Sequence, residues 1–281
     1  MDPPRPSIAD KRRSFRKLHE SGCFVIPNPW DVGSARFLQG LGFKALATTS
    51  SGFAWSQGHA DNAITRDMAL AHLRDMVAAT DVPVNADFEN GFAREAAGVT
   101  ESVRLAVGTG VAGLSIEDST GDQARPLFEI GEAVERMRAA RKAIDQAGGD
   151  TLLVGRAECF LVGMPDLAET IRRLQAYAEA GADCLYAPGL RTPEQIAAVV
   201  AAVAPKPFNL LVGSASALTV PQIAALGVRR ISVGGALARS AWGGFIRAAK
   251  SLADQGTFTA FADAAPGGDL NAFFQGDLKH R

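Results

Sequence analysis

The sequence is poor in cysteine and nearly neutral. Its 281 residues contain three cysteines, Cys23, Cys159 and Cys184, which are widely spaced and form no Cys-x-x-Cys pair. This pattern indicates neither a disulfide framework nor a zinc site, and it favours a reducing compartment, which we expect to be the cytoplasm. The formal net charge of −1 gives no sustained basic surface, so nucleic acid is not expected as the main partner. A small, anionic metabolite fits better.

Long apolar runs are also absent. No stretch of the sequence is long and apolar enough to span a bilayer, so no membrane partner is expected. Residues 1–20 contain several lysines and arginines, but they lack the apolar centre of a signal peptide and include acidic residues. We interpret this segment as a solvated first helix.

Short apolar or β-branched runs alternate with segments of helical spacing along most of the chain. Eight such runs occur, at residues 24–26, 45–49, 84–87, 113–117, 152–157, 184–187, 208–212 and 230–233. Eight strand–helix units are the number in a closed barrel, so the sequence predicts the α/β class with a (β/α)8 TIM-type barrel. A doubly wound open sheet would show the same alternation, but no Gly-x-Gly-x-x-Gly motif follows the first strand.

The chain is expected to form one domain, residues 1–281, with the barrel core at about residues 22–255. We interpret the segment 256–281 as a helical appendage at the carboxyl end. It carries four phenylalanines that need a surface to cover, which could be the barrel or a neighbouring subunit. These are Phe258, Phe261, Phe273 and Phe274.

Two of the predicted strands end in acidic residues instead of turn residues. Asp87 and Glu89 follow the third strand, and Glu117 closes the fourth. The carboxyl ends of the strands form the catalytic face of a β/α barrel, so these side chains are expected to converge there. If the third strand continued through Glu89, both of its acids would lie on one face, within reach of Glu117. Such oxygen ligands suit Mg²⁺ or Mn²⁺, although acids at these turns also cap helices or pair with arginines.

Two further segments at strand ends suggest anion binding. Arg156 ends the fifth predicted strand, where a fixed guanidinium could bind a substrate carboxylate through two parallel hydrogen bonds. The structural alternative for Arg156 is a salt bridge to Glu158 or Glu117. After the second strand, the Ser-Ser-Gly segment at residues 50–52 could bind a carboxylate or an oxyanion through backbone N–H groups, or could form an ordinary polar loop.

The four histidines carry little functional signal. His59 lies in a loop near Asp61 and could be a proton carrier, but we interpret it as a solvated loop residue. The other three lie on predicted helices or in the tail and are expected at the surface. These are His19, His72 and His280.

Five motifs follow one another at strand ends: PNPWD at residues 27–31, TTSSG at 48–52, VNADFENG at 84–91, GLSIED at 113–118 and GRAE at 155–158. Later segments continue the pattern, with GAD at 181–183, PFN at 207–209 and GVRRISVG at 227–234. In order and spacing, this set resembles the isocitrate lyase/phosphoenolpyruvate mutase superfamily over roughly residues 10–255. The set is specific for the superfamily and much less so for any one reaction.

The resemblance implies a β/α barrel whose eighth helix is exchanged between paired subunits, commonly in a tetramer that is a dimer of dimers. It also implies a Mg²⁺ ion that chelates an α-oxo-acid. At the matching positions Asp87 would hold the metal, with Asp61, Glu89 and Glu117 acting directly or through water. Glu89 stands where many members have Asp, so its longer side chain could coordinate the metal differently.

The resemblance also implies roles in substrate binding and catalysis. The residues that would bind the oxo-acid substrate are Ser50, Ser51, Gly52, Asp87, Arg156 and Asn209. The residues that would act in catalysis are Arg156, Asp61 and Glu117.

The loop after residue 118 departs from the family pattern. Members that cleave isocitrate or methylisocitrate carry a Lys-(Lys/Arg)-Cys-Gly-His loop whose thiol protonates the departing carbanion, whereas residues 119–127 read STGDQARPL here. The Lys and the Asn-Ser pair of phosphonopyruvate-processing members are missing as well. Asp122, Arg125 or His59 could serve as an acid or base if a lid closes over the site.

The sequence therefore favours a Mg²⁺-dependent carbon–carbon lyase that acts on a small 2-oxo- or 2-hydroxy-carboxylate through an enolate. Its chemistry would be oxaloacetate-decarboxylase-like or 2-methylisocitrate-lyase-like. Decarboxylation of a β-oxo-acid needs no carbanion-protonating thiol at the cleavage step, so it is the simplest reaction that the remaining residues support. The alternatives are a phosphonomutase-type enzyme acting on phosphoenolpyruvate-like substrates and a non-catalytic oxo-acid-binding protein.

Overall fold

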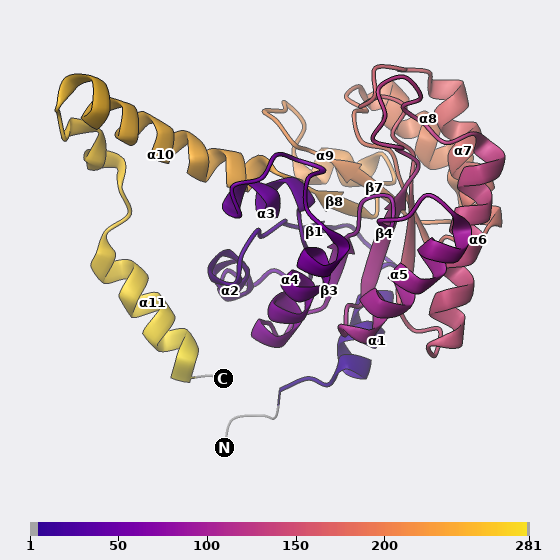
Figure 1. The fold of residues 1–281 in the computed structure, drawn as a ribbon, viewed down its shortest axis with the longest axis horizontal. Coiled ribbons are helices and arrows are strands. Elements are labelled where there is room, and N and C mark those ends of the chain that lie inside the picture. The colour runs from indigo at the N-terminus through magenta and orange to yellow at the C-terminus, as the bar shows by residue number, and fades with distance from the viewer. Residues whose placement is uncertain (1–4, 280–281) are drawn as a thin grey trace.

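Eight parallel strands form the centre of the molecule (Figure 1). In the computed structural model, which describes residues 5–279, they are β1 Phe24–Ile26, β2 Leu46–Ala47, β3 Val84–Asp87, β4 Gly113–Glu117, β5 Leu152–Arg156, β6 Cys184–Tyr186, β7 Phe208–Leu211 and β8 Arg230–Ser232. Each lies within a run predicted from the sequence. Neighbours follow chain order from β2 to β8, and β8 pairs with β1, which confirms a nearly closed TIM-type barrel.

Asn28 bridges the seam at which the barrel closes. A backbone hydrogen bond of 3.0 Å from the Ala47 N–H to the Pro27 carbonyl joins the ends of β1 and β2. The buried Asn28 amide donates to the Thr48 carbonyl at 2.8 Å, and its oxygen accepts the Val233 N–H at 2.9 Å. One side chain therefore connects the ends of β8, β1 and β2, which explains an asparagine directly after the first strand.

Helices surround the barrel, with one exception. They are α1 Ile8–Leu18, α2 Val32–Gly40, α3 Ser50–Ser56, α4 Arg66–Ala79, α5 Ala96–Gly108, α6 Ile130–Gln146, α7 Leu167–Glu179, α8 Pro193–Val203, α9 Val220–Ala225, α10 Ala236–Gln255 and α11 Gly267–Lys279, with a 3₁₀ helix η1 at Thr259–Asp263. Helix α10 extends away from the barrel, and α11 returns beside α2 (Figure 1). Across residues 5–279, no helix has the length and apolar character needed to cross a bilayer.

The first helix is not simply solvated, as the sequence predicted, because α1 closes the amino-terminal end of the barrel. Phe15 is fully buried and packs with Ile26 of β1 and Leu152 of β5. Lys11 is also buried, and its ammonium donates to the Val77 carbonyl at 3.1 Å, near the end of α4. The basic composition concealed this role, because a long lysine stem can be buried while its charge meets helix-end carbonyls.

The prediction that the histidines lie at the surface is wrong for His72. It is buried in α4, and its ring stacks on Phe53 with 4.0 Å between the centroids. Burial lowers the pKa of His72 to about 4. His19 is half-buried, and burial together with the positive charge of Arg230 lowers its pKa to about 3. His280 lies outside the described residues.

The appendage covers part of its own barrel. In α11, Phe273 and Phe274 are half-buried, and the Phe273 ring lies 4.8 Å from that of Phe37 in α2. Phe258 and Phe261, near η1, remain 66% and 49% exposed. The barrel therefore partly covers Phe273 and Phe274, whereas Phe258 and Phe261 stay exposed within this chain.

Replacing His72 should reduce the sensitivity of the fold to acid. The pKa of His72 is about 4 in the folded state and near about 6.5 in an unfolded chain. As the pH falls between these values, the unfolded chain binds the proton first, so stability is lost by at most about 1.4 kcal/mol per pH unit. The His72→Phe variant should lose less free energy of unfolding over this interval than the wild type, as measured by denaturant titrations at several pH values.

The matched control is His59→Phe, because His59 is exposed. It should leave the pH dependence of stability unchanged. The lowered pKa of His19 also makes stability fall as the pH falls. The His72→Phe variant should therefore keep part of the wild-type dependence of stability on pH. A slope identical to that of the wild type would contradict a neutral, buried His72.

Candidate active site

A cavity of about 180 Å³ opens at the carboxyl ends of the strands, the face on which barrel enzymes carry their active sites. Each of the eight strands, or the segment that follows it, contributes to the lining. The predicted site residues that line it are Ser50, Ser51, Asp61, Asp87, Arg156 and Asn209. Gly52, Glu89 and Glu117 are not part of this lining. The topology therefore brings most of the predicted site to one place.

Arg156, at the end of β5, lies among the acidic residues. Its Nη1 atom is 3.1 Å from Asp87 Oδ1 and 3.2 Å from Glu117 Oε2, and its Nε donates to Glu158. The Tyr186 ring lies against the guanidinium, with 5.0 Å between its centroid and Cζ. The ion pairs that the sequence suggested as a structural alternative are therefore present. They fix the guanidinium at the cavity wall, and its five N–H donors leave capacity for a bound anion.

Asp87, the last residue of β3, is held from several directions. Its backbone N–H donates to the Thr48 hydroxyl at 2.9 Å. Its Oδ2 atom accepts from the backbone N–H and the hydroxyl of Ser50, at 3.0 and 2.9 Å. The Ser50 N–H, which the sequence suggested for substrate binding, thus positions Asp87 in this structure.

Gly52 is explained by the close packing of α3 against α10. Its N–H donates to the Thr49 hydroxyl at 3.3 Å. A Cβ atom at this position would lie 2.7 Å from Thr49 Cγ2 and 3.1 Å from Ala238 Cβ in α10, so a larger residue would push the two helices apart. The binding of substrate by Gly52 and by Ser51, which lines the cavity, stays a prediction.

The chain turns at Glu89, so β3 does not continue through it. The expectation that Asp87 and Glu89 share one face of a strand is therefore wrong. Glu89 adopts the left-handed conformation, with φ 46°, and its carbonyl accepts the Glu117 N–H at 3.0 Å. Its carboxylate is buried, and Oε1 has no hydrogen-bond partner among the described residues. Burial and the nearby charges of Asp87 and Asp61 raise the pKa of Glu89 to about 8.

The site is short of positive charge. Burial and neighbouring acids raise the pKa of Glu117 and of Glu158, despite the opposing effect of Arg156. At the solvent-exposed rim, partial burial and the charge of Asp87 raise the pKa of Asp61. The carboxylates near the one Arg156 guanidinium are Asp61, Asp87, Glu89, Glu117 and Glu158. This excess of acids favours the binding of an additional cation.

The carboxylate oxygens of the site are the type of ligand that Mg²⁺ and Mn²⁺ prefer. The Glu89 Oε1 atom, which has no hydrogen-bond partner among the described residues, is such an oxygen. Within residues 5–279, however, no three His, Cys, Asp or Glu side chains are grouped so that they could bind one ion together. Mg²⁺ usually keeps several water ligands, so Asp87 could bind it directly while other acids act through water. Direct coordination by Glu89 and Glu117 stays a prediction.

Asn209 and Arg230 occupy the interior of the barrel at the edge of the cavity. Asn209 is fully buried, donates to the Ser232 hydroxyl at 2.9 Å and accepts from Arg230 Nε at 2.8 Å. Arg230 is 3% exposed and lines the cavity as well. Sequence reasoning does not identify Arg230, although an arginine at the start of a short buried strand is a signal that could have done so.

Asp118 anchors this cluster from behind. It is buried, and its Oδ1 atom accepts the Glu158 N–H at 2.8 Å. Its Oδ2 atom accepts from the Tyr177 hydroxyl at 2.5 Å and from Arg173 at 3.0 Å. These bonds tie the segment that follows Arg156 to α7. No sequence signal marks this network, because Tyr177 and Arg173 are remote from Asp118 along the chain.

The loop at residues 119–127 lies beside the site and does not enter it. Arg125 forms an ion pair with Glu132 at the surface. Asp122 and the exposed His59 are also absent from the lining of the site cavity. Roles for these three residues as acid or base require a movement of the chain and stay predictions.

A (β/α)8 barrel with acids and an arginine at neighbouring strand ends has the architecture of a barrel enzyme, and the family match assigns it to the lyase or mutase kind. The model of the phosphoenolpyruvate phosphomutase family matches residues 15–253. The chain therefore belongs to this family, within the isocitrate lyase/phosphoenolpyruvate mutase superfamily.

Known proteins support this assignment. A crystal structure from Burkholderia cenocepacia J2315, provisionally assigned as a lyase or mutase, has a TM-score of 0.92 and 48% identity, covering 95% of this chain and 97% of that chain. A phosphonopyruvate hydrolase in complex with oxalate and Mg²⁺ has a TM-score of 0.82 and 27% identity, covering 96% of both chains. An oxaloacetate decarboxylase from Paraburkholderia xenovorans (strain LB400) is 29% identical over 79% of this chain and 74% of its own length.

Substituting Asp118 should destabilise the protein more than substituting an exposed acid. Asp118→Asn weakens a buried ion pair and leaves Arg173 without its full counter-charge, which should cost about 3 kcal/mol. Asp145→Asn is the matched control, because the Asp145 side chain is 60% exposed in its pair with Arg141 and should contribute less than about 1 kcal/mol. Denaturant unfolding compares the two, and equal losses would contradict an anchoring role for Asp118.

Proposed function

We propose that this protein is a divalent-metal-dependent lyase that cleaves a carbon–carbon bond in a small 2-oxo- or 2-hydroxy-carboxylate through an enolate. The observation that carries the proposal is the excess of carboxylates around Arg156 at the wall of the cavity. Its relatives include an oxaloacetate decarboxylase and a 2-methylisocitrate lyase from Escherichia coli (strain K12). Decarboxylation of oxaloacetate leaves the electron pair on a pyruvate enolate, whereas cleavage of 2-methylisocitrate leaves it on the departing carbanion, so both reactions need stabilisation of negative charge.

Different residues of this chain would bind the metal ion and the substrate. Asp87 would hold Mg²⁺ or Mn²⁺, with Asp61, Glu89 and Glu117 acting directly or through water. When bound, such an ion supplies positive charge where the substrate oxygens gain negative charge. Arg156 would bind the substrate carboxylate and keep it in one orientation. A preorganised donor of this kind is commonly worth about 10²–10³ in rate.

The lack of a thiol at the cavity favours decarboxylation within this class. None of Cys23, Cys159 and Cys184 lines the cavity. Loss of CO₂ from a β-oxo-acid leaves the electron pair on the enolate, so the cleavage step needs no side chain to protonate a departing carbanion. An oxaloacetate-decarboxylase-like reaction therefore fits this chain better than cleavage of 2-methylisocitrate.

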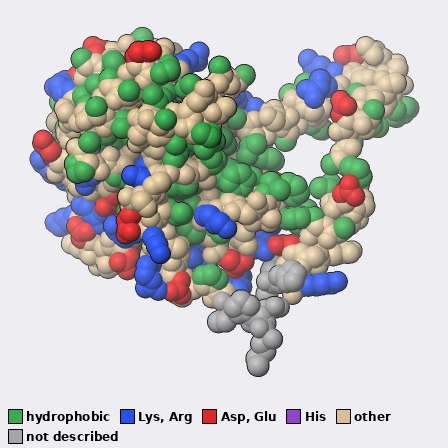
Figure 2. All heavy atoms as spheres, turned by 180° about the vertical axis from the view of Figure 1, so that it is seen from behind, with side chains coloured by type: hydrophobic (Ala, Val, Ile, Leu, Met, Phe, Trp, Pro, Cys, Tyr) green, Lys and Arg blue, Asp and Glu red, His purple; other side chains and the backbone are tan. Residues whose placement is uncertain are grey.

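The proposal includes a second copy of this chain as a partner. In α10, which leaves the barrel, Ala238 is the buried residue, while Trp242 and Phe245 are 36% and 61% exposed. Figure 2 shows hydrophobic side chains along this arm and on the barrel surface that faces it. Exposed apolar area of this kind is typical of an interface. An exchange of α10 between two subunits, within a dimer of dimers, would cover it.

Activity assays of the purified protein with Mg²⁺ test the proposed reaction. We expect turnover of oxaloacetate in preference to 2-methylisocitrate or an alkylmalate, and Asp87→Ala or Arg156→Gln should lower kcat/KM by at least about 10²-fold. Asp145→Ala, at an exposed position, is the control and should keep wild-type activity. Turnover of phosphoenolpyruvate or phosphonopyruvate alone would instead support a phosphonomutase-type enzyme. Stabilisation by oxalate and Mg²⁺ without turnover of any compound would support a non-catalytic binder.

Light scattering after size-exclusion chromatography tests the proposed partner. Wild type should elute as an oligomer, and Phe245→Asp should shift it toward the monomer, because a carboxylate in an apolar interface is costly to bury. Asp254→Ala, also on the exposed part of α10, is the control and should keep the oligomer. A monomeric wild type would refute the exchanged helix.

A further inference from the structure

Tyr186, the last residue of β6, lines the site cavity next to Arg156. Its side chain is buried, and its ring centroid lies 5.0 Å from Arg156 Cζ. In the sheet it is paired with Arg156 of β5 on one side and with Asn209 of β7 on the other. A phenol, whose hydroxyl can release and regain a proton, therefore lies against the guanidinium that would bind the substrate.

Hydrogen bonds across the barrel interior lead from Arg230 toward Tyr186. Arg230 Nε donates to Asn209 Oδ1 at 2.8 Å, and Asn209 Nδ2 donates to the Ser232 hydroxyl at 2.9 Å. An arginine can only donate, so the amide oxygen of Asn209 must face Arg230 and its NH₂ group must face Ser232. Ser232 therefore accepts from Asn209 and keeps its own hydroxyl proton for another acceptor.

That acceptor is the phenol oxygen of Tyr186. Burial raises the pKa of Tyr186 to about 12, while the charge of Arg156 and a hydrogen bond with Ser232 act in the opposite direction. A hydrogen bond lowers the pKa of a phenol when the neighbouring group donates to the phenol oxygen. In the described part of the chain, no group accepts the proton of the Tyr186 hydroxyl. That proton is therefore free for a molecule bound in the cavity.

The hydrogen-bond partners of Arg230 in the described structure are neutral. Arg230 is buried, and besides Asn209 its side chain contacts His19 and Asn85. His19 is uncharged near neutral pH, because burial and the charge of Arg230 lower its pKa to about 3. The positive charge of Arg230 thus polarises the hydrogen bonds that lead to Tyr186, which stabilises negative charge on the phenol oxygen.

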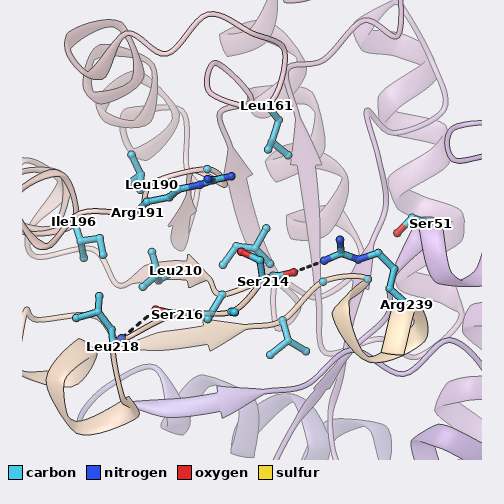
Figure 3. A pocket seen from close by; sticks show the side chains of 18 of the residues that line it. Ser51, Leu161, Leu190, Arg191, Ile196, Leu210, Ser214, Ser216, Leu218 and Arg239 are labelled. Carbon is cyan, nitrogen blue, oxygen red and sulfur yellow. Dashed lines mark hydrogen bonds between the residues drawn. The ribbon is translucent and has the colours of Figure 1, made fainter. Parts of the chain in front are cut away.

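A wider cavity connects the site with solvent. It has a volume of about 690 Å³ and lies among the segments that follow β6, β7 and β8 (Figure 3). It shares Ser51 and Leu161 with the site cavity, and its lining includes the exposed Ser214 and Ser216. Water can therefore reach the site and replace a proton that Tyr186 gives up.

We propose that Tyr186 is the catalytic acid that protonates the enolate. This inference rests on the proposed function, in which loss of CO₂ breaks the bond between C3 and its carboxylate and leaves the electron pair on the enolate. A C–H bond then forms at C3 as the O–H bond of Tyr186 breaks. The tyrosinate that remains is stabilised by Arg156 and by the Ser232 hydroxyl, and it regains a proton from water. Each turnover thus consumes one solvent proton and yields CO₂ and a shorter oxo-acid.

The stereochemistry of protonation tests this role in the full-length protein with Mg²⁺. Freshly dissolved 2-oxo-3-methylsuccinate in D₂O gives 2-oxobutanoate with one deuterium at C3, and immediate reduction to 2-hydroxybutanoate preserves that configuration for NMR. Wild type should give one C3 configuration, because a side chain delivers deuterium to one face of the enolate. Tyr186→Phe keeps the ring against Arg156 and removes the hydroxyl, so it should still release CO₂ but give both configurations in similar amounts. Tyr177→Phe is the matched control, because Tyr177 lies outside the cavity lining, and it should keep one configuration.

Oxalate affinity separates proton transfer from support of Arg156. Oxalate resembles a pyruvate enolate in charge and shape but takes up no proton at carbon, so titration calorimetry should give equal affinities for wild type and Tyr186→Phe. A variant that keeps one configuration would overturn the catalytic role of Tyr186, as would a parallel loss of oxalate affinity and CO₂ release. Wild type that releases CO₂ but gives both configurations would refute Tyr186 as the acid and keep the lyase, whereas wild type that cleaves no oxo-acid would refute both.

Discussion

The buried ion pairs around Arg156 are the interaction on which the arrangement of the site depends. Its partners Asp87, Glu117 and Glu158 come from β3, β4 and the segment after β5, so one guanidinium links three neighbouring strand ends. Buried ion pairs contribute little net stability, because desolvation offsets much of the attraction, yet the loss of one partner leaves a costly charge. The cluster is therefore better explained as a means of fixing a positive charge at the cavity wall than as a source of stability.

The fold could be predicted from the sequence because its signals are local and repeated. Short runs such as Val84–Asp87 and Gly113–Glu117 are buried on both sides, as expected for parallel strands, and helical spacing separates the runs. Long-range packing is not encoded in this way. The burial of Phe15 under the barrel and of His72 against Phe53 depends on which elements meet, and neither composition nor spacing reveals it.

The parts of the site that could be predicted are the strand-end residues, because the topology of the barrel determines where they lie. Asp87 ends β3 and Arg156 ends β5, and both strands pair in parallel with β4, which brings their ends close together. Glu89 shows the limit of this reasoning, because a single left-handed residue after β3 redirects its side chain. Contacts between a strand end and a distant helix, such as that of Asp118 with Tyr177, depend on tertiary packing that no local pattern records.

The charge at the site also bears on the order in which ligands would bind. Without an added cation, an acid group that enters the cavity meets the carboxylates of Asp61 and Asp87, which repel it and compete for Arg156. Under the proposed function, an oxo-acid would therefore bind stably beside Arg156 once a divalent ion offsets these acids. The excess of acidic side chains that favours a metal would thus make metal binding a condition for substrate binding.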